Sequence, residues 1–196
     1  MKRLEGFATR AYARLRGLDF RYVPPEKLNA DLSRVRAYAD SRIWLRAALS
    51  RFANESLLNS ADQALDLGCG KGGAVSVLSR YFARADGIDI SPDLITIGRE
   101  NLRRMGIANA SLTACDAAEF RNFDGYGFLY IFNPFSRAVM ARATSNLAAS
   151  LHSHPRRMTI LYLNPLDIDL FEAQGFRRLR EIYPKRTEYP FVLLAC

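Results

Sequence analysis

The sequence has few cysteines, few histidines and no long apolar segment. Its three cysteines, Cys69, Cys115 and Cys196, are odd in number and lack metal-ligand spacing, which argues against a disulfide framework or a zinc site. The longest apolar run, residues 191–196, is roughly six residues, whereas a bilayer-spanning helix needs about 18. No apolar stretch follows the charges of the first residues, so no secretory signal is indicated. These absences predict no metal site, no membrane span and a cytoplasmic location.

The composition is that of a globular protein with an excess of basic residues. The 196 residues are 49% hydrophobic and 24% charged, which is typical of one folded domain, alone or with an appended arm. The net charge is +8, and residues 1–60 hold 12 Lys and Arg against 6 Asp and Glu. This basic segment could attract a nucleic acid or another anionic partner. Alternatively, its arginines are spread over solvated helix faces.

The first 60 residues are predicted to be helical. Apolar residues recur at helical spacing over 4–18, 28–39 and 43–52, and Pro24-Pro25 separates the first two sets. Residues 1–60 are therefore expected to form a helical arm or lid, and residues 61–196 to form the functional domain.

From residue 61 onward the pattern alternates between short apolar runs and helical segments. Such alternation predicts a parallel sheet with helices on both faces. Strands are expected at 64–67, 85–90, 110–115, 128–132, 158–163, 176–182 and 189–194, and helices at 74–82, 92–105, 137–151 and 166–173. The last two strands are expected to pair as a terminal hairpin.

A glycine-rich turn follows the first predicted strand. Gly68, Gly70 and Gly73 satisfy the G-x-G-x-x-G pattern, and Asp89 lies about 20 residues on, where an acid would bind a ribose. Such a turn presents backbone N–H groups and a helix N-terminus to a ligand. The same glycines could also form a tight turn that binds nothing.

Asp66, two residues before this turn, discriminates between nucleotide cofactors. A dinucleotide would bring its diphosphate beside the carboxylate, at a penalty of roughly 3 kcal/mol per charge pair at ~6 Å and an effective dielectric constant of ~20. S-adenosylmethionine (SAM) carries a sulfonium and an ammonium instead. The sign of the charge therefore favours SAM over a nicotinamide dinucleotide.

Four motifs in order resemble those of the class I SAM-dependent methyltransferases. Residues 65–73 (LDLGCGKGG) are similar to the first motif, 87–91 (GIDIS) to the acid that ends the second strand, 115–117 (CDA) to the end of the third strand, and 132–135 (FNPF) to the end of the fourth. Gly175-Phe176 and the terminal hairpin resemble the reversed seventh strand of the family. The Asn-Pro-Phe sequence also resembles that of a small bacterial group. The resemblance implies a Rossmann-like, seven-stranded, mostly parallel sheet.

The resemblance also implies a cofactor site for SAM, with S-adenosylhomocysteine (SAH) as the product. Asp89 would accept the ribose hydroxyls, Ile90 would pack on the adenine, and Asp116 with the Ala117 backbone would bind the adenine edge. Asp116 could instead be a local cap. The cofactor-binding residues expected are Asp66, Gly68, Cys69, Gly70, Gly72, Asp89, Ile90, Asp116, Ala117 and Asn133.

Asn133, Pro134 and Phe135 are the candidate catalytic residues, with a role in positioning the substrate. In amino-methylating relatives the corresponding Asn or Asp oxygen and proline carbonyl hold the target amine, and an aromatic ring packs on it. Those relatives have two prolines where this sequence has one, which shifts Phe135. Asn133 could instead orient the cofactor or satisfy loop backbone, and Phe135 could be a core residue.

No general base is evident from the sequence. His152 and His154 precede the fifth strand and are expected at the edge of the sheet opposite the cofactor. Loops on the cofactor side contain Asn164, Asp167, Lys185, Arg186 and Tyr189, and no spacing singles out one of them.

The sequence favours an enzyme that methylates oxygen or nitrogen of a small-molecule or carbohydrate acceptor by in-line transfer from the sulfonium. The alternatives are a methyltransferase of nucleic acid or of a protein side chain, and a non-catalytic nucleic-acid-binding protein on the same fold. The sequence does not indicate the oligomeric state.

Overall fold

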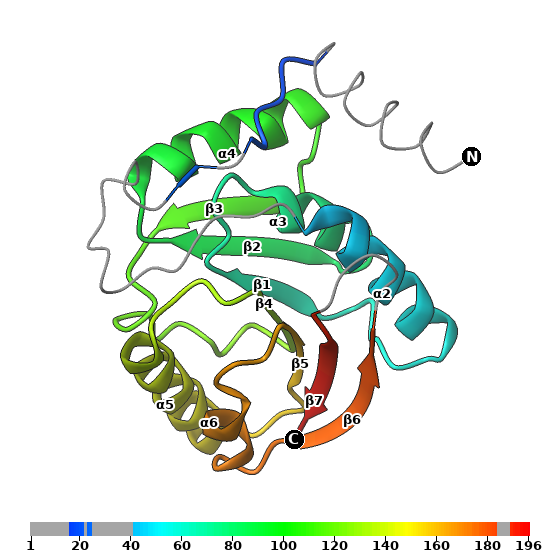
Figure 1. Ribbon diagram of the computed structural model, residues 1–196, viewed down its shortest axis with the longest axis vertical. Helices are drawn as coiled ribbons and strands as arrows, with labels where there is room; N and C mark the ends of the chain where they lie inside the picture. Colours follow the sequence, from blue (N-terminus) through cyan, green and yellow to red (C-terminus); the bar gives the residue numbers. More distant parts are fainter. Residues whose placement is uncertain (1–15, 22, 25–40, 184–188) are drawn as a thin grey trace.

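The computed structural model describes residues 16–21, 23–24, 41–183 and 189–196 (Figure 1). The expected helix over 28–39 and most of that over 4–18 lie outside these residues. Residues 16–18, which the apolar spacing assigned to the first helix, are not helical. Gly17 has a φ of 62°, a left-handed conformation that interrupts a right-handed helix. The helical expectation was therefore wrong at this end of the segment.

The core of the molecule is one seven-stranded sheet in the order β3-β2-β1-β4-β5-β7-β6. The strands are β1 (Gln63–Leu67), β2 (Arg84–Asp89), β3 (Ala110–Ala114), β4 (Phe128–Ile131), β5 (Thr159–Leu163), β6 (Arg177–Ile182) and β7 (Phe191–Ala195). β1 to β5 pair in parallel, and β7 is antiparallel to both β5 and β6. This confirms the Rossmann-like sheet with a reversed C-terminal strand.

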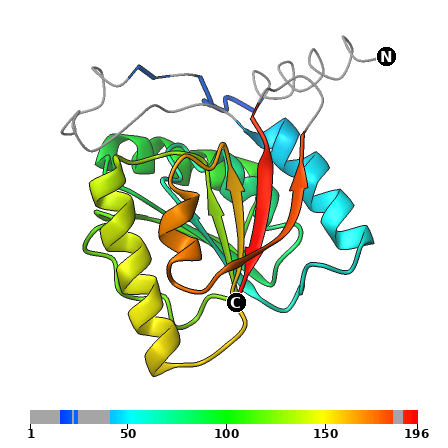
Figure 2. The same ribbon diagram turned by 60° about the horizontal axis from the view of Figure 1, so that its bottom comes forward.

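Helices cover both faces of the sheet (Figure 2). They are α2 (Arg42–Asn54), α3 (Gly73–Leu78), α4 (Pro92–Met105), α5 (Arg137–Ser153) and α6 (Ile168–Glu172). One hydrophobic cluster joins α2, α3 and α4 to the sheet, and a second joins α5 and α6 to its other face. Because Leu45, Leu49 and Phe52 of α2 are fully buried in the first cluster, this helix of the expected arm is part of the main core.

Local sequence signals explain the elements near the site. β4 and β5 are buried at every position, as expected for apolar strands covered on both faces. α4 begins after Ser91, whose hydroxyl accepts a hydrogen bond from the Leu94 amide, and it ends at Gly106, which has a φ of 69°. α3 ends at Leu78, four residues before the predicted end, because i→i+3 hydrogen bonds from Arg80 and Tyr81 tighten the chain there.

The strand order reverses between the neighbouring strands β1 and β4: from β1 the chain continues to β2 and β3 on one side of the sheet, and from β4 it continues to β5 on the other. In open parallel sheets, ligands bind in the crevice at the carboxyl ends of the strands at such a point. No helix in the described part of the chain is long and apolar enough to cross a membrane.

Candidate functional site

The glycine turn joins β1 to α3 and is held against the end of β2. The backbone amides of Gly68 and Cys69 both donate to the Ile88 carbonyl, at 2.9 Å each. Gly68, Gly70 and Gly72 have φ values of 83°, 51° and 74°. These lie in the left-handed region, which residues other than glycine rarely adopt. Three of the predicted glycines are therefore required by the shape of the turn.

The glycine turn also touches the Asn-Pro-Phe motif directly. A Cβ atom on Gly68 would lie 2.0 Å from Cβ of Pro134, which is closer than two carbons can approach. The turn after β1 and the turn after β4 thus form one surface at the switch point. The sequence had predicted both motifs, and the structure brings them into contact.

Asp66 is buried beneath the glycine turn, with a relative exposure of 3%. Its backbone pairs with Gly87 of β2 on one side and with Tyr130 of β4 on the other. Burial raises the pKa of its carboxyl group well above the usual value, and the nearby charge of Asp89 raises it further. A cation beside this group would favour its ionised form. The site therefore holds a desolvated acid suited to a positively charged ligand.

Asp89 connects the end of β2 to the glycine turn. Its Oδ2 accepts a hydrogen bond from the Gly70 amide and its Oδ1 accepts one from the Ser91 amide, both at 2.9 Å. Burial raises the pKa of this carboxyl group, and the two backbone hydrogen bonds oppose that effect. Each carboxylate oxygen has two lone pairs, so each can accept another hydrogen bond.

The remaining predicted cofactor residues lie at the ends of β1, β2 and β3. Ile90 follows β2 and is half-buried, whereas Ala117 is buried. Oδ1 of Asp116 accepts a hydrogen bond from the Ala118 amide at 2.9 Å, so this side chain caps its own loop. The Cys69 thiol is buried, and burial together with the charges of Asp66 and Asp89 raises its pKa, which keeps it protonated.

Asn133 is an unusual residue at the end of β4. Its φ is 38°, and it is 8% exposed. Neither Nδ2 nor Oδ1 of its side chain has a hydrogen-bond partner among the residues the structure describes. A buried polar group left without a partner costs about 1–3 kcal/mol, so native proteins rarely retain one without reason. The lack of a hydrogen-bond partner among the described residues distinguishes this side-chain amide within the site.

Phe135 does not share this environment. Its side chain is 5% exposed and belongs to the hydrophobic cluster on the α5 face, together with Val139 and Met140. The structure thus favours the core interpretation of Phe135 over stacking on a substrate. Its position one residue earlier than in relatives with two prolines is consistent with this difference.

A second asparagine-proline turn lies at the end of the adjacent strand β5. Asn164 precedes Pro165 and also has a positive φ, of 54°. Its backbone amide donates to the Pro190 carbonyl at 2.9 Å, which fixes the start of β7 beside it. Because β4 and β5 are parallel neighbours, Asn133 and Asn164, which follow these strands, lie at the same edge of the sheet.

Ion pairs connect the segments that follow these two turns, namely the start of α5 and the loop and helix after β5. The Arg137 guanidinium, at the start of α5, lies 3.2 Å from Oδ1 of the buried Asp167 and also bonds Asp169. Asp167 was one of the candidate loop residues, and it is engaged in one of these ion pairs. The arginine was missed because no local pattern links residues 30 positions apart.

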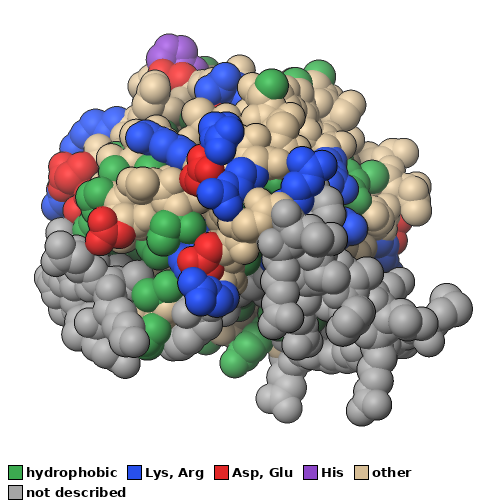
Figure 3. Space-filling model, turned by 90° about the horizontal axis from the view of Figure 1, so that it is seen from above, with side chains coloured by type: hydrophobic (Ala, Val, Ile, Leu, Met, Phe, Trp, Pro, Cys, Tyr) green, Lys and Arg blue, Asp and Glu red, His purple; other side chains and the backbone are tan. Residues whose placement is uncertain are grey.

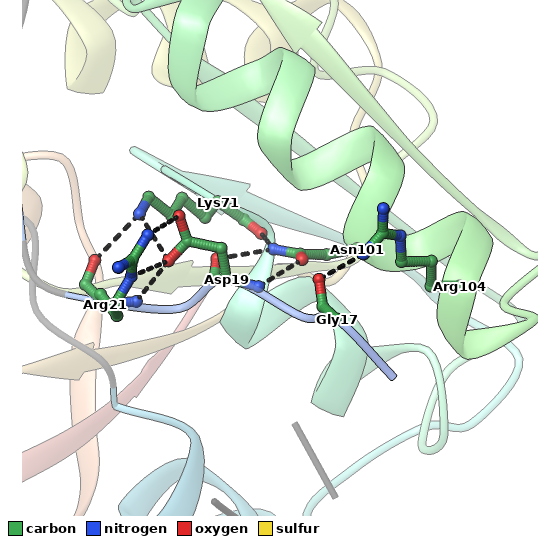
Figure 4. Close-up of polar contacts among 6 residues, drawn as sticks. All are labelled: Gly17, Asp19, Arg21, Lys71, Asn101 and Arg104. Carbon is green, nitrogen blue, oxygen red and sulfur yellow. Dashed lines mark hydrogen bonds and ion pairs between the residues drawn. The ribbon is translucent and has the colours of Figure 1, made fainter. Parts of the chain in front are cut away.

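The sequence analysis also missed an ion pair behind the glycine turn, between the buried Lys71 and the partly exposed Asp19 (Figure 4). Nζ of Lys71 lies 3.1 Å from Oδ1 of Asp19 and donates to the Arg21 carbonyl at 3.0 Å. Asn101 of α4 exchanges two hydrogen bonds of 2.9 Å with the backbone of Asp19 and donates to the Lys71 carbonyl at 3.1 Å. The only indication of this ion pair in the sequence was that Lys71 is a single lysine among the small residues of the turn.

The other titratable candidates lie away from this site or outside the described residues. His152 and His154 are exposed at the C-terminal end of α5, at the edge opposite Asn133, and Nδ1 of His154 lies 3.4 Å from Oδ2 of Asp124. Tyr189 is exposed, and Lys185 and Arg186 fall outside the described segments. Within the described ranges, no group of three or more His, Cys, Asp or Glu could hold a metal ion.

Comparisons with known proteins agree with this geometry. A family model described as a methyltransferase domain matches residues 58–149. A curated relative, the 23S rRNA (uracil(747)-C(5))-methyltransferase RlmC of Vibrio cholerae, is 29% identical over 118 residues, which are 60% of this chain but 28% of that protein. The chain thus spans less than a third of this relative.

Solved structures share the fold at low sequence identity. A SAM-dependent methyltransferase from Aquifex aeolicus is 15% identical with a TM-score of 0.62, covering 80% of this chain and 93% of that one. Magnesium protoporphyrin IX methyltransferase from Synechocystis PCC 6803, solved with bound SAM, is 16% identical with a TM-score of 0.61, covering 80% and 79%. Residues 58–149 therefore match a methyltransferase domain, and the chain shares the Rossmann-like fold of solved SAM-dependent methyltransferases.

Proposed function

We propose that this protein binds SAM at the carboxyl ends of β1, β2 and β3 and methylates an acceptor held over the ends of β4 and β5. The observation that carries this proposal is the pair of carboxyl groups at the glycine turn: Asp66 is buried in β1 directly before the turn, and Asp89 accepts a hydrogen bond from the Gly70 amide. Two acids beside a glycine turn favour a cationic ligand and disfavour a diphosphate. When bound, SAM supplies an electrophilic methyl group on its sulfonium.

The cofactor is held by groups that the turn and the strand ends present. Asp89 accepts the ribose hydroxyls through its remaining lone pairs, and Ile90 covers the adenine ring. Asp116 and the Ala117 backbone lie at the end of β3, where the adenine edge would be read. The backbone of Gly68, Cys69, Gly70 and Gly72 lines the remainder, with Asp66 beneath it.

The acceptor is held by the asparagine-proline turns. Asn133 presents both a carbonyl oxygen and an NH₂ group that lack partners in the described structure, so it can orient a hydroxyl or an amine. Holding the acceptor atom about 3 Å from the methyl group supplies much of the rate. Pro134, packed against Gly68, keeps this amide beside the cofactor turn. We favour a small-molecule or carbohydrate acceptor, methylated at oxygen or nitrogen.

A nucleic-acid acceptor is the second candidate. It is favoured by the similarity to an rRNA methyltransferase and by the net charge of +8. On the face seen in Figure 3, basic side chains are interspersed with acidic ones. On α4, Arg103 and Arg104 both pair with Glu100, at 2.7 and 2.6 Å. Interspersed charges attract a polyanion less strongly than a surface of one sign.

Calorimetry and product analysis test the proposal. We expect the purified protein to bind SAM and SAH and not to bind NAD, and we expect an acceptor heavier by one methylene group after incubation with SAM. Small-molecule and carbohydrate extracts, and RNA in parallel, distinguish the two acceptor classes. RNA binding that falls steeply with salt, with methylation of the RNA, would favour the second candidate. A protein that binds NAD but neither SAM nor SAH would overturn the proposal.

A further inference from the structure

Three exposed apolar side chains lie at one edge of the sheet. The described part of the chain exposes five large apolar residues, and three of them, Leu166, Tyr183 and Tyr189, flank the ends of β5, β6 and β7. We call these three residues the apolar rim. The other two, Ile43 and Leu179, belong to α2 and to the middle of β6. Single exposed apolar residues are normal on a protein surface, whereas a group of them in one place marks a binding surface.

The register of the sheet brings the apolar rim together. β5, β7 and β6 lie side by side, with β7 between the other two (Figure 2). Phe191, the first residue of β7, pairs with the last residue of β5 and with the last residue of β6. Leu166 lies three residues beyond β5, Tyr183 directly follows β6, and Tyr189 lies two residues before β7. Because neighbouring strands are about 4.8 Å apart, the ends of β5 and β6 are separated by roughly 10 Å, a distance comparable to the length of a small two-ring molecule.

Local hydrogen bonds hold two of these residues in exposed positions. The Leu166 amide donates to the Asn164 carbonyl at 2.9 Å, and the next residue, Asp167, is buried, so Leu166 lies at the outside of a fixed turn. Tyr183 donates its hydroxyl hydrogen to Oε1 of Glu181 at 2.7 Å, although 67% of the residue is exposed. The polar end of Tyr183 is thus satisfied by its own strand, and its ring faces solvent.

The apolar rim adjoins the proposed acceptor site. Asn133 follows β4 and Asn164 follows the neighbouring strand β5, and the Asn164 amide donates to the carbonyl of Pro190, the residue after Tyr189. The row along this edge therefore begins at the buried Asn133 amide, which has no partner among the described residues, and continues into the rim. A ligand that matches both ends has a polar group at one end and an apolar body at the other.

The exposed area suits a small ligand better than a second protein. Aromatic side chains bury roughly 150–250 Å² each, so these three partly exposed residues offer on the order of 300 Å². A stable protein interface buries about 800 Å² on each partner. Two of the three rim residues are tyrosines, whose rings pack favourably against other aromatic rings, and this favours an aromatic ligand over an alkyl chain of the same area.

We propose that the apolar rim binds an aromatic ring of the methyl acceptor, so that the acceptor is a small aromatic molecule whose hydroxyl or amino group reaches Asn133. This inference rests on the proposed function and narrows its acceptor class. A ring that covers the rim removes apolar surface of both molecules from water, which contributes binding energy without contacting the reacting atom. A polyol without an aromatic ring gains much less from this contact.

Binding of 2-naphthol, a two-ring alcohol, tests the inference before any natural acceptor is identified. Calorimetry and saturation-transfer NMR measure its affinity for the protein saturated with SAH, which has no methyl group to transfer. We expect the wild type to bind 2-naphthol and not glucose. Leu166→Ser and Tyr183→Ala should each weaken 2-naphthol by roughly five- to tenfold, because each removes apolar surface that the ring covers. Circular dichroism and SAH affinity show that the variants remain folded.

Leu179→Ser is the matched control. Leu179 is also an exposed apolar residue, but it lies three residues before the end of β6, at a strand rise that places it about 10 Å from that end. It should leave the affinity for 2-naphthol unchanged, whereas adsorption to any apolar surface would be weakened alike by all three substitutions. Equal affinities in the wild type and the three variants, or no binding of 2-naphthol to the SAH-bound wild type, would overturn the inference.

Two other occupants of the apolar rim are separated by the same variants. A dimer of the wild type that dissociates in Tyr183→Ala, measured by sedimentation, would assign the rim to a second copy of the chain. Binding of a single-stranded RNA that depends on Tyr183, without binding of 2-naphthol, would assign it to a nucleobase. Either result would overturn the inference. A wild-type protein that binds neither SAM nor SAH would instead refute the proposed function itself, so the two failures are distinguishable.

Discussion

Gly68 and Pro134 lie against each other so closely that a single methyl group on Gly68 would occupy the position of the proline ring. The contact joins the turn after β1 to the turn after β4, the two strands that flank the switch point of the sheet. The turn after β1 belongs to the proposed cofactor site, and the turn after β4 belongs to the proposed acceptor site. Their relative position therefore depends on the absence of a side chain at residue 68.

Gly68→Ala is expected to destabilise the protein by several kcal/mol, because it adds a clash to the cost of a left-handed backbone, which alone is about 1–2 kcal/mol. Gly106→Ala is the matched control, since Gly106 also has a positive φ but a Cβ atom there would meet nothing within 4 Å. Urea denaturation of both variants separates the clash from the backbone strain. Equal losses of unfolding free energy would show that Pro134 can move aside.

Asp89→Ala is expected to weaken SAM binding by roughly ten- to a hundredfold, because hydrogen bonds to a charged group contribute about 1.5–3 kcal/mol. The variant also leaves the Gly70 and Ser91 amides without their acceptor. Asp93→Asn, which changes an exposed acid in the first turn of α4, is the control. Calorimetry that finds near-normal affinity in Asp89→Ala would contradict the role assigned to this carboxylate.

SAM affinity is expected to rise with pH, because Asp66 must lose its proton to interact with the bound cation. Burial and the charge of Asp89 raise the pKa of Asp66 in the free protein, so part of the binding energy is used to ionise it. Affinity should fall as the pH drops through this raised pKa, and binding should release a proton. Titrations in buffers of different ionisation enthalpy measure that release. Asp66→Asn should bind SAM weakly with a flat pH profile.

In contrast to SAM affinity, the stability of the unliganded protein is expected to fall as the pH rises. A carboxyl group whose pKa is higher in the folded state than in the unfolded state stabilises the fold below the unfolded pKa, and this contribution is lost as the pH rises through the folded value. Asp66 should therefore lower the stability of the unliganded protein at high pH, and Asp66→Asn should reduce that loss. Thermal denaturation across pH, with and without SAM, checks both signs. An unchanged pH dependence in Asp66→Asn would contradict the assignment.

Asn133→Gly is expected to reduce methyl transfer sharply while leaving SAM affinity and stability nearly unchanged. Glycine adopts the positive φ of this position without strain, and the amide it removes has no partner among the described residues. Turnover with an identified acceptor, together with denaturation curves, measures the two effects separately. Full turnover in this variant would show that the amide does not hold the acceptor.

Much of the architecture could be predicted because it is encoded locally. The apolar runs of β4 and β5, and the capping residues Ser91 and Gly106 of α4, are readable from neighbouring positions. Likewise, the glycine turn and Asp89 occur in one short segment with a characteristic spacing. The local reading failed at Gly17, where apolar periodicity suggested a helix but the backbone is left-handed.

The contacts that refine the site could not be predicted, because they join residues distant in sequence. Lys71 and Asp19 are distant in sequence and meet only in the folded chain, and so do Arg137 and Asp167. The sequence analysis also did not predict that Asp66 is buried between β2 and β4. Burial depends on packing from both sides and leaves no local pattern.

The two hydrogen bonds that Asp89 accepts from Gly70 and Ser91 have a consequence for the energetics of ligand capture. They fix the carboxylate and the turn in one arrangement before any nucleoside arrives, so little conformational entropy remains to be lost on association. In the proposed site, the half assigned to adenosine is accordingly preorganised, and the proposal leaves adaptation to different methyl acceptors to the loops beyond β4 and β5.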